Sequence, residues 1–202
     1  MNKIAKIPAR DHDVIEHELL PAIANRWSPR AFKKEPIEEA DFGKILEAAR
    51  WAASSMNEQP WRLLYALKGE IAFDKIASTL MEGNRRWAKE AAMLMVTIVK
   101  KNFSMNDKPN RTAHHDLGLA IGNLSIQATK LGIGLHQMGG FDPAMAERLF
   151  EIPEGYEAVT AIALGYYGNL HQLDEPFRSR ETSRRTRKKV EDFAFHGKFR
   201  KD

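Results

Sequence analysis

Apolar residues recur at helical spacing along four segments of the chain, and this pattern predicts amphipathic helices. The clearest segments are residues 38–51 and 112–131, and residues 71–81 and 13–24 show the pattern more weakly. The apolar stripe of the first comprises Phe42, Ile45, Leu46 and Ala49, and that of the second comprises Leu117, Ala120, Ile121, Leu124, Ala128 and Leu131. In the segment 13–24 the candidate packing residues are Val14, Ile15, Leu19 and Leu20.

Three further segments have the length of strands and lack helical spacing. Residues 91–99 form a continuous apolar run, residues 156–166 form a second, and residues 61–67 follow Pro60 as a third. Uninterrupted apolar runs are typical of strands that are buried on both faces. The sequence therefore predicts a sheet covered by helices. Residues 84–89 follow neither pattern and are interpreted as a loop or lid.

Two pairs of glycines stand out against this background. Gly118 and Gly122 lie four residues apart in the helix predicted at 112–131, where each glycine costs up to about 1 kcal/mol relative to alanine. This spacing indicates close helix packing, either at a subunit interface or within one subunit. Gly139 and Gly140 would let the backbone approach a ligand closely, and the following Asp142-Pro143 predicts a helix start.

Composition indicates an ordinary globular protein, and we expect residues 1–202 to form a single domain. Hydrophobic residues make up 43% of the chain, and the absence of cysteine excludes disulfides, thiolate zinc sites and cysteine nucleophiles. No apolar run approaches membrane-spanning length, and residues 1–8 lack the apolar core of a signal peptide. We therefore expect a cytoplasmic protein without membrane contact.

Charge is unevenly distributed. The net charge is only +4, but residues 177–189 carry seven basic residues against one acid, Glu181. Such a run could bind nucleic acid, line an anion site or simply be solvated. Near the other end of the chain, Arg26, Ser28 and Arg30 alternate, and alternate residues of an extended segment share a face. Two guanidiniums and a hydroxyl could then converge on one anion such as a phosphate.

Hydroxyl and amide side chains gather in the loop between the helix at 38–51 and the strand at 61–67. They are Ser54, Ser55, Asn57 and Gln59. Pro60 excludes its predecessor from the right-handed helical region, so we expect extended backbone there. Side-chain amides carry a donor and an acceptor on one plane, which suits the edge of a flat heterocycle. The alternative interpretation is a helix cap and turn.

No metal site is predicted. His114-His115-Asp116 lacks the i,i+4 spacing of helical metal ligands, and His136 is interpreted as a packed histidine. The four tryptophans are interpreted as core residues, with Trp87 in the possible lid as the exception to watch.

Four segments together resemble the nitroreductase family of FMN-dependent oxidoreductases. They are Arg26-x-Ser28-x-Arg30-x-Phe32, Ser54-Ser-Met-Asn57-Glu-Gln-Pro-Trp61, Gly139-Gly-Phe141 and Arg185-Thr-Arg187-Lys188. The resemblance covers roughly residues 26–195. It implies an α+β fold with a mostly antiparallel central sheet flanked by helices, in an intertwined homodimer with FMN at the subunit interface. Residues 1–25 would then be an N-terminal extension or helix, and the basic segment 177–202 would contribute to the FMN phosphate site.

The resemblance also implies individual roles. Arg26, Ser28 and Arg30, together with Arg185 and Arg187, would hold the phosphate and ribityl end of FMN. Ser54, Ser55 and Asn57 would reach the flavin from the partner subunit, and residues 137–140 would run along the ring with a backbone amide near N5. The full set of implied cofactor-binding residues is Arg26, Trp27, Ser28, Arg30, Ser54, Ser55, Asn57, Gln59, Gln137, Met138, Gly139, Gly140, Arg185 and Arg187.

The implied reaction transfers a hydride from NADH or NADPH through FMN to a small organic acceptor such as a nitroaromatic, quinone or enone. No catalytic side chain is required, and the Gly139 backbone amide is the one candidate group. Many relatives have glutamate where this chain has Gly139, so a carboxylate contribution near N5 is in question. The acceptor and the choice between NADH and NADPH stay open. Two alternative functions are a non-catalytic flavin carrier or sensor and a nucleic-acid-binding domain that uses the basic tail.

Overall fold

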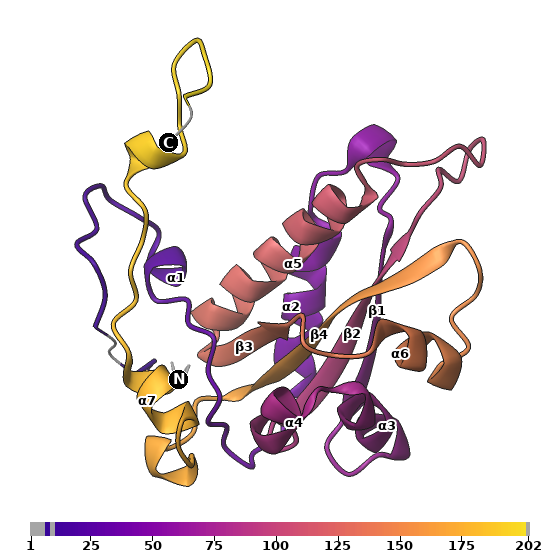
Figure 1. The fold of residues 1–202 in the computed structure, drawn as a ribbon. Coiled ribbons are helices and arrows are strands. Elements are labelled where there is room, and N and C mark those ends of the chain that lie inside the picture. The colour runs from indigo at the N-terminus through magenta and orange to yellow at the C-terminus, as the bar shows by residue number, and fades with distance from the viewer. Residues whose placement is uncertain (1–6, 9–10, 201–202) are drawn as a thin grey trace.

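The computed structural model describes residues 7–8 and 11–200. A four-stranded sheet lies at its centre, with strand order β1-β2-β4-β3 and antiparallel pairing throughout (Figure 1). The strands are β1 (Trp61–Leu67), β2 (Met93–Lys100), β3 (Ile133–Met138) and β4 (Tyr156–Tyr166). The predicted bounds of β1 and β4 are confirmed, and β2 begins two residues later than predicted. The expectation of a mostly antiparallel sheet is therefore confirmed.

Strand β2 shows why the strands of this sheet have continuous apolar sequences. Met93 and Met95 face one core, whereas Leu94 and Val96 face a second core on the opposite side of the sheet. All seven residues from Met93 to Val99 are buried. A strand covered on both faces has no solvent side and therefore no polar alternation.

Helices form a layer on each face of the sheet, which makes the fold α+β (Figure 1). Helices α2 (Glu39–Arg50) and α5 (Ala113–Lys130) pack together on one face, and their apolar stripes enter that core. The opposite face is covered by α3 (Ile71–Thr79), α4 (Glu82–Ala88) and α6 (Pro143–Leu149). Asp142 caps α6 as predicted, since its carboxylate accepts from the Met145 N–H at 2.9 Å.

The helix predicted for residues 13–24 is wrong over most of its length. Only α1 (Pro21–Ala24) is helical, and Val14 is 83% exposed rather than packed. Pro21 explains the difference. Proline lacks an N–H and clashes with the preceding turn, so it is tolerated at the first position of a helix but not inside one. The expectations for residues 1–6 and 9–10 lie outside the described residues.

The loop predicted for residues 84–89 is also wrong, because residues 84–88 belong to α4 and Lys89 caps its end. Trp87 is 3% exposed and lies near Phe32 and His136, with ring centroids 6.3 Å and 4.5 Å away. A helix of seven residues is too short to display an amphipathic period, and burial of Trp87 and Ala88 fixes it in place.

Two other expectations need correction, namely the alternative in which Gly118 and Gly122 pack within one subunit and the placement of all four tryptophans in the core. A Cβ at Gly118 or Gly122 would meet nothing within 4 Å, so these glycines do not pack against another part of the described chain. Of the tryptophans, Trp27 and Trp87 are buried and Trp61 is half-buried, but Trp51 is 74% exposed. Trp51 follows α2 and Gly118 and Gly122 lie on α5, so open positions occur on both helices of this layer.

After β4 the chain continues through η2 (Leu170–Gln172), α7 (Phe177–Thr182) and η3 (Val190–Asp192), and η1 (Ser55–Asn57) lies between α2 and β1. The last part runs beside the N-terminal segment, where His12 and Arg185 form a parallel bridge (Figure 1). No helix within residues 7–8 and 11–200 is long and apolar enough to cross a membrane.

Candidate functional site

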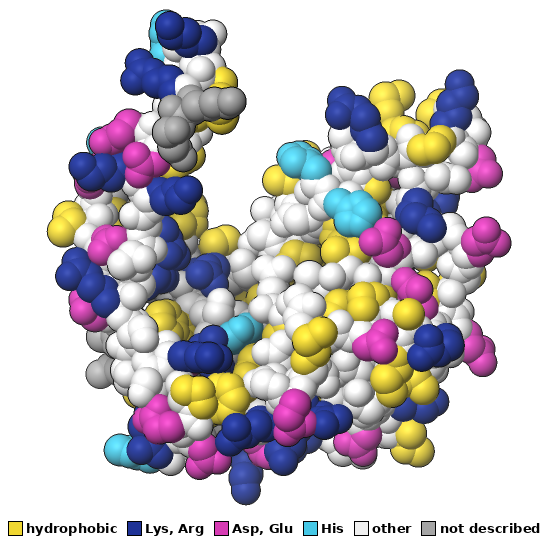
Figure 2. Space-filling view, viewed as in Figure 1, with side chains coloured by type: hydrophobic (Ala, Val, Ile, Leu, Met, Phe, Trp, Pro, Cys, Tyr) yellow, Lys and Arg dark blue, Asp and Glu magenta, His cyan; other side chains and the backbone are white. Residues whose placement is uncertain are grey.

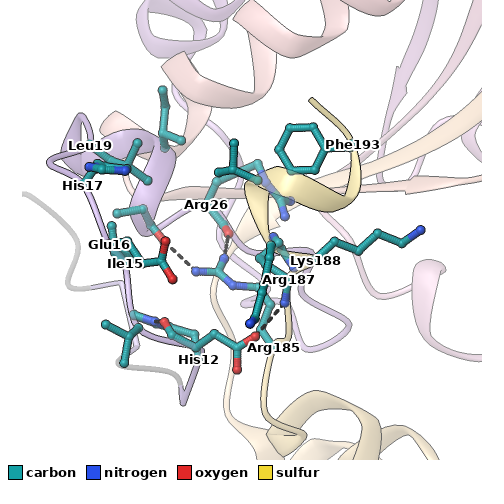
Figure 3. A pocket seen from close by; sticks show the side chains of 16 residues that line it. His12, Ile15, Glu16, His17, Leu19, Arg26, Arg185, Arg187, Lys188 and Phe193 are labelled. Atoms are coloured by element: carbon teal, nitrogen blue, oxygen red, sulfur yellow. Dashed lines mark hydrogen bonds between the residues drawn. The ribbon is translucent and has the colours of Figure 1, made fainter. Parts of the chain in front are cut away.

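Three arginines from opposite ends of the sequence line one cavity of about 690 Å³. Arg26 comes from the segment after α1, and Arg185 and Arg187 come from the tail (Figure 3). The cavity lies between the tail and the N-terminal segment. Its wall also includes apolar side chains such as Ile23 and Phe193, the basic Lys188 and Lys189, and two acids, Asp13 and Glu16. In Figure 2, lysine and arginine side chains gather on the arm formed by these two segments, facing a hollow in the molecule.

The electrostatics of this arginine cluster (Arg26, Arg185 and Arg187) favour an anion. Burial and the nearby Arg187 lower the pKa of Arg26 below its ordinary value. Burial, followed by Arg187 and Arg26, lowers the pKa of Arg185 in the same way. Among the described residues, no carboxylate lies within ion-pair distance of any of the three guanidiniums. A bound dianion would relieve this repulsion and accept charge-assisted hydrogen bonds.

Backbone carbonyls orient the cluster. The Arg185 guanidinium donates to the carbonyl oxygens of Ala24, at 2.7 Å, and of Arg26. Arg26 in turn donates from Nη1 to the Ser28 hydroxyl at 3.0 Å. Arg26 and the tail arginines therefore lie together, with Ser28 bonded to Arg26, and their joint binding of a phosphate stays a prediction.

Arg30 is placed elsewhere. Its guanidinium lies 3.5 Å from the Glu181 carboxylate and 5.9 Å from the centroid of the Trp87 ring. Glu181 also accepts from the Trp27 indole N–H at 3.0 Å and from the Arg30 backbone N–H at 3.2 Å, and its side chain is 1% exposed. Arg30 thus lines a second cavity, of about 470 Å³, and is not part of the arginine cluster.

The loop with Ser54, Ser55, Asn57 and Gln59 has unusual backbone geometry. Met56 and Asn57 both have φ of 54° and Gln59 has φ of 51°, in the left-handed region that non-glycine residues rarely adopt. The extended conformation predicted for Gln59 is wrong, since a left-handed residue also avoids the clash with Pro60. Such strained positions persist only where the surroundings enforce them, and they concentrate at functional sites.

Two contacts enforce this loop. The Ser54 hydroxyl accepts from the Gln59 backbone N–H at 3.0 Å. The Asp116 carboxylate, 3% exposed in the first turn of α5, accepts from the Ser55 N–H at 3.0 Å. Asn57 itself is exposed, so its amide is available to a ligand. The importance of Asp116 was missed, because nothing in the sequence pairs it with a residue 61 positions away.

The end of β3 presents a backbone edge. Gln137 is exposed and Met138 is 2% exposed in the core. A Cβ on Gly139 would meet nothing within 4 Å, whereas a Cβ on Gly140 would lie 2.7 Å from the amide nitrogen of Asn84. Asn84 donates to the Gly140 carbonyl at 2.9 Å. This contact comes from α4, so it could not be expected from the interpretation of residues 84–89 as a loop.

His136 is packed, as interpreted from the sequence. Its Nδ1 donates to the Pro29 carbonyl at 2.9 Å, and its ring lies against Trp87. Burial, with a further contribution from Arg30, lowers the pKa of His136 to about 4. The imidazole is therefore neutral near pH 7. Within the part of the chain that the structure describes, no group of three or more histidine, aspartate or glutamate residues could hold a metal.

The loop and the arginine cluster lie at opposite ends of α5. Ser55 is bonded in the first turn of this helix, whereas α1 and the tail lie beside its other end (Figure 1). With 18 residues and a rise of 1.5 Å each, α5 is about 27 Å long. One chain therefore does not bring these two sets of predicted site residues together.

Comparison with known proteins gives a consistent result. The nitroreductase family model matches residues 23–97 and 66–166. A solved structure described as an oxidoreductase containing FMN has 33% sequence identity and a TM-score of 0.89, covering 96% of this chain and 99% of that chain. A putative nitroreductase in complex with FMN from Desulfovibrio desulfuricans has 22% identity and a TM-score of 0.70, covering 92% and 100%.

A curated relative points the same way. The major NAD(P)H-flavin oxidoreductase of Aliivibrio fischeri is 24% identical over 192 residues, which cover 75% of this chain and 88% of that protein. The family match, the antiparallel sheet with a helical layer on each face, and the arginine cluster agree. This chain belongs to the nitroreductase family.

Proposed function

We propose that this protein is an FMN-dependent oxidoreductase that takes a hydride from NADH or NADPH and reduces a small organic acceptor. The observation that carries the proposal is the arginine cluster, in which three guanidiniums line one cavity and, within residues 7–8 and 11–200, have no carboxylate partner. The FMN phosphate is a dianion with several acceptor oxygens, and arginine binds such groups with charge-assisted hydrogen bonds. The chemistry of the donor set therefore fits FMN.

The remaining site residues fit the rest of the cofactor. Bound FMN would supply the hydride chemistry, accepting from the nicotinamide and passing to the acceptor. The chain itself would bind and orient it. Arg26, Arg185 and Arg187 would hold the phosphate, and the exposed Gly139 backbone would be free to contact the ring.

We further propose that the functional unit is a homodimer. The loop of Asn57 is held at the far end of α5 from the arginine cluster, so a second copy of the chain would have to supply it. The layer of α2 and α5 offers an interface, because Trp51 is 74% exposed and Gly118 and Gly122 are uncovered. Small residues on an open helix face allow close approach of a partner helix.

Turnover separates an enzyme from a flavin carrier. Protein reconstituted with FMN should lose its flavin absorbance when NADH or NADPH is added without oxygen. A nitroaromatic or a quinone should then restore the absorbance. Flavin that is bound but not reduced by either nucleotide would indicate a carrier or sensor. Failure to bind FMN at all would contradict the proposal entirely.

A further inference from the structure

Residues 11–13 of the N-terminal segment pair with residues 184–187 of the tail beside the arginine cluster, and we call this pairing the clamp. His12 pairs with Arg185 in a parallel bridge. The Asp13 N–H donates to the Arg185 carbonyl at 3.0 Å, and the Arg185 N–H donates to the Asp11 carbonyl at 3.0 Å. Both segments of this clamp lie outside the residues 23–166 spanned by the family match.

Asp13 is the side chain that secures the clamp. Its carboxylate accepts from the Arg187 backbone N–H at 2.7 Å and lies 3.3 Å from Nε of Arg184. Its side chain is 33% exposed, so the ion pair with Arg184, itself 57% exposed, contributes little alone. The hydrogen bond to the Arg187 amide is the more directional contact. It fixes the backbone from which the Arg187 side chain enters the cavity.

We propose that Asp13 is a positioning residue for the anion site, holding residues 184–187 so that Arg185 and Arg187 face Arg26 across the cavity. This inference rests on the proposed function, because it takes the FMN phosphate as the anion. Asp13 would not contact the phosphate itself. It lines the same cavity, and its negative charge taken alone opposes phosphate binding.

The charge of Asp13 and its positioning role have opposite effects on the affinity for FMN, so substitution of Asp13 distinguishes between them. Asp13→Ala and Glu16→Ala each remove one acid from the wall of the same cavity. Within the described residues, the Glu16 carboxylate makes no hydrogen bond to the tail, so its removal changes charge without disturbing the clamp. Simple electrostatics predicts tighter FMN binding for both variants. The positioning role predicts weaker FMN binding for Asp13→Ala only.

Riboflavin, which is FMN without its phosphate, separates the anion site from the rest of the fold. We expect Asp13→Ala to raise the Kd for FMN about 10-fold, the effect of losing roughly one hydrogen bond to a charged group. The Kd for riboflavin should stay unchanged. Glu16→Ala should bind FMN at least as tightly as wild type. Equal weakening of FMN and riboflavin by Asp13→Ala would overturn the proposal, since it would report general damage.

Hydrogen exchange of the flavin-free protein provides an independent readout. The amides of Asp13 and Arg185 are bonded across the clamp and should exchange faster in Asp13→Ala than in wild type or Glu16→Ala. Unchanged exchange, or an unchanged preference for FMN over riboflavin in Asp13→Ala, would overturn the positioning role alone. Wild-type protein without any preference for FMN would instead refute the phosphate assignment, and this inference with it.

Discussion

The arginine cluster makes the most direct residue-scale prediction. Arg185 contacts two backbone carbonyls and faces Arg26 and Arg187, so Arg185→Ala removes a charge from the anion site. Charge-assisted hydrogen bonds contribute about 1.5–3 kcal/mol, so the Kd for FMN should rise about 10- to 150-fold. The exposed Arg111 lies outside the cavity, and Arg111→Ala should leave the Kd unchanged. Equal effects of both substitutions in a fluorescence titration would contradict the assignment.

If the tail instead bound nucleic acid, its substitutions would weaken DNA binding with strong salt dependence and leave FMN binding unchanged.

Gly139 tests the backbone contribution to the flavin site. Its φ is not in the left-handed region, and a Cβ there meets open space, so Gly139→Ala should be mild in stability and activity. Gly139→Pro removes the N–H and should shift the reduction potential of bound FMN and slow reduction by NAD(P)H. A redox titration beside wild type measures this. Unchanged potential and rate in Gly139→Pro would remove this amide from the mechanism.

His136 makes a prediction about pH. Its pKa is lowered to about 4 in the folded protein, against an ordinary value of 6.5. Between these values the unfolded chain binds a proton that the folded chain does not, so stability falls as pH decreases from 6.5 toward 4. The loss attributable to His136 should be up to about 3 kcal/mol. Urea unfolding of wild type and His136→Gln across this range tests it, and identical pH slopes would show that His136 is not the cause.

At the scale of single residues, the sequence predicted the chemical character of the site side chains better than their positions. Arg26, Arg185 and Arg187 line one cavity and Ser28 contacts Arg26, whereas their binding of one anion stays a prediction. Arg30 does not join them, since the buried Glu181 binds both its backbone and its guanidinium. Tertiary partners such as Glu181 and Asp116 leave no signal in the local pattern, so sequence reasoning could not have assigned them.

At the scale of elements, the strained loop between α2 and β1 depends on α5. Asp116→Ala removes the acceptor of the Ser55 N–H, so Met56, Asn57 and Gln59 should relax from their left-handed conformations. We expect a loss of about 1–3 kcal/mol in stability and weaker FMN binding.

Asp142→Ala is the matched control, because it also removes a carboxylate bonded to a backbone amide, the Met145 N–H. It should lower stability by about 0.5–2 kcal/mol without affecting the Kd for FMN. Weakened FMN binding in both variants would show that the loop has no special role.

Long periodic or uniformly apolar elements were predictable, and short ones were not. The helices α2 and α5 and the strands β1, β2 and β4 follow their patterns because each buries a full stripe or both faces. Helix α4 is too short to show a period, and the segment before Pro21 has apolar residues that the described chain leaves exposed. The local sequence pattern indicates which residues are buried, but it does not indicate which other elements cover them.

At the scale of the whole molecule, the open α2–α5 layer and the separated halves of the site point to the same arrangement. The arginine cluster of one chain and the Asn57 loop of another would together hold one FMN. A dimer built in this way contains two equivalent sites. Each site takes its arginines from one subunit and its loop from the other. Subunit mixing therefore has a distinctive outcome.

Mixed dimers of Arg185→Ala and Asn57→Ala test this central claim most directly. In either homodimer both FMN sites carry one defect. In the mixed dimer one site carries both defects, and the other combines an intact arginine cluster with an intact loop. The measurement is the FMN bound per dimer after co-refolding the two variants, with differently tagged chains to isolate the mixed species. The account predicts one site of wild-type affinity per mixed dimer. FMN binding that remains as weak in the mixed dimer as in both homodimers would contradict a site shared between subunits.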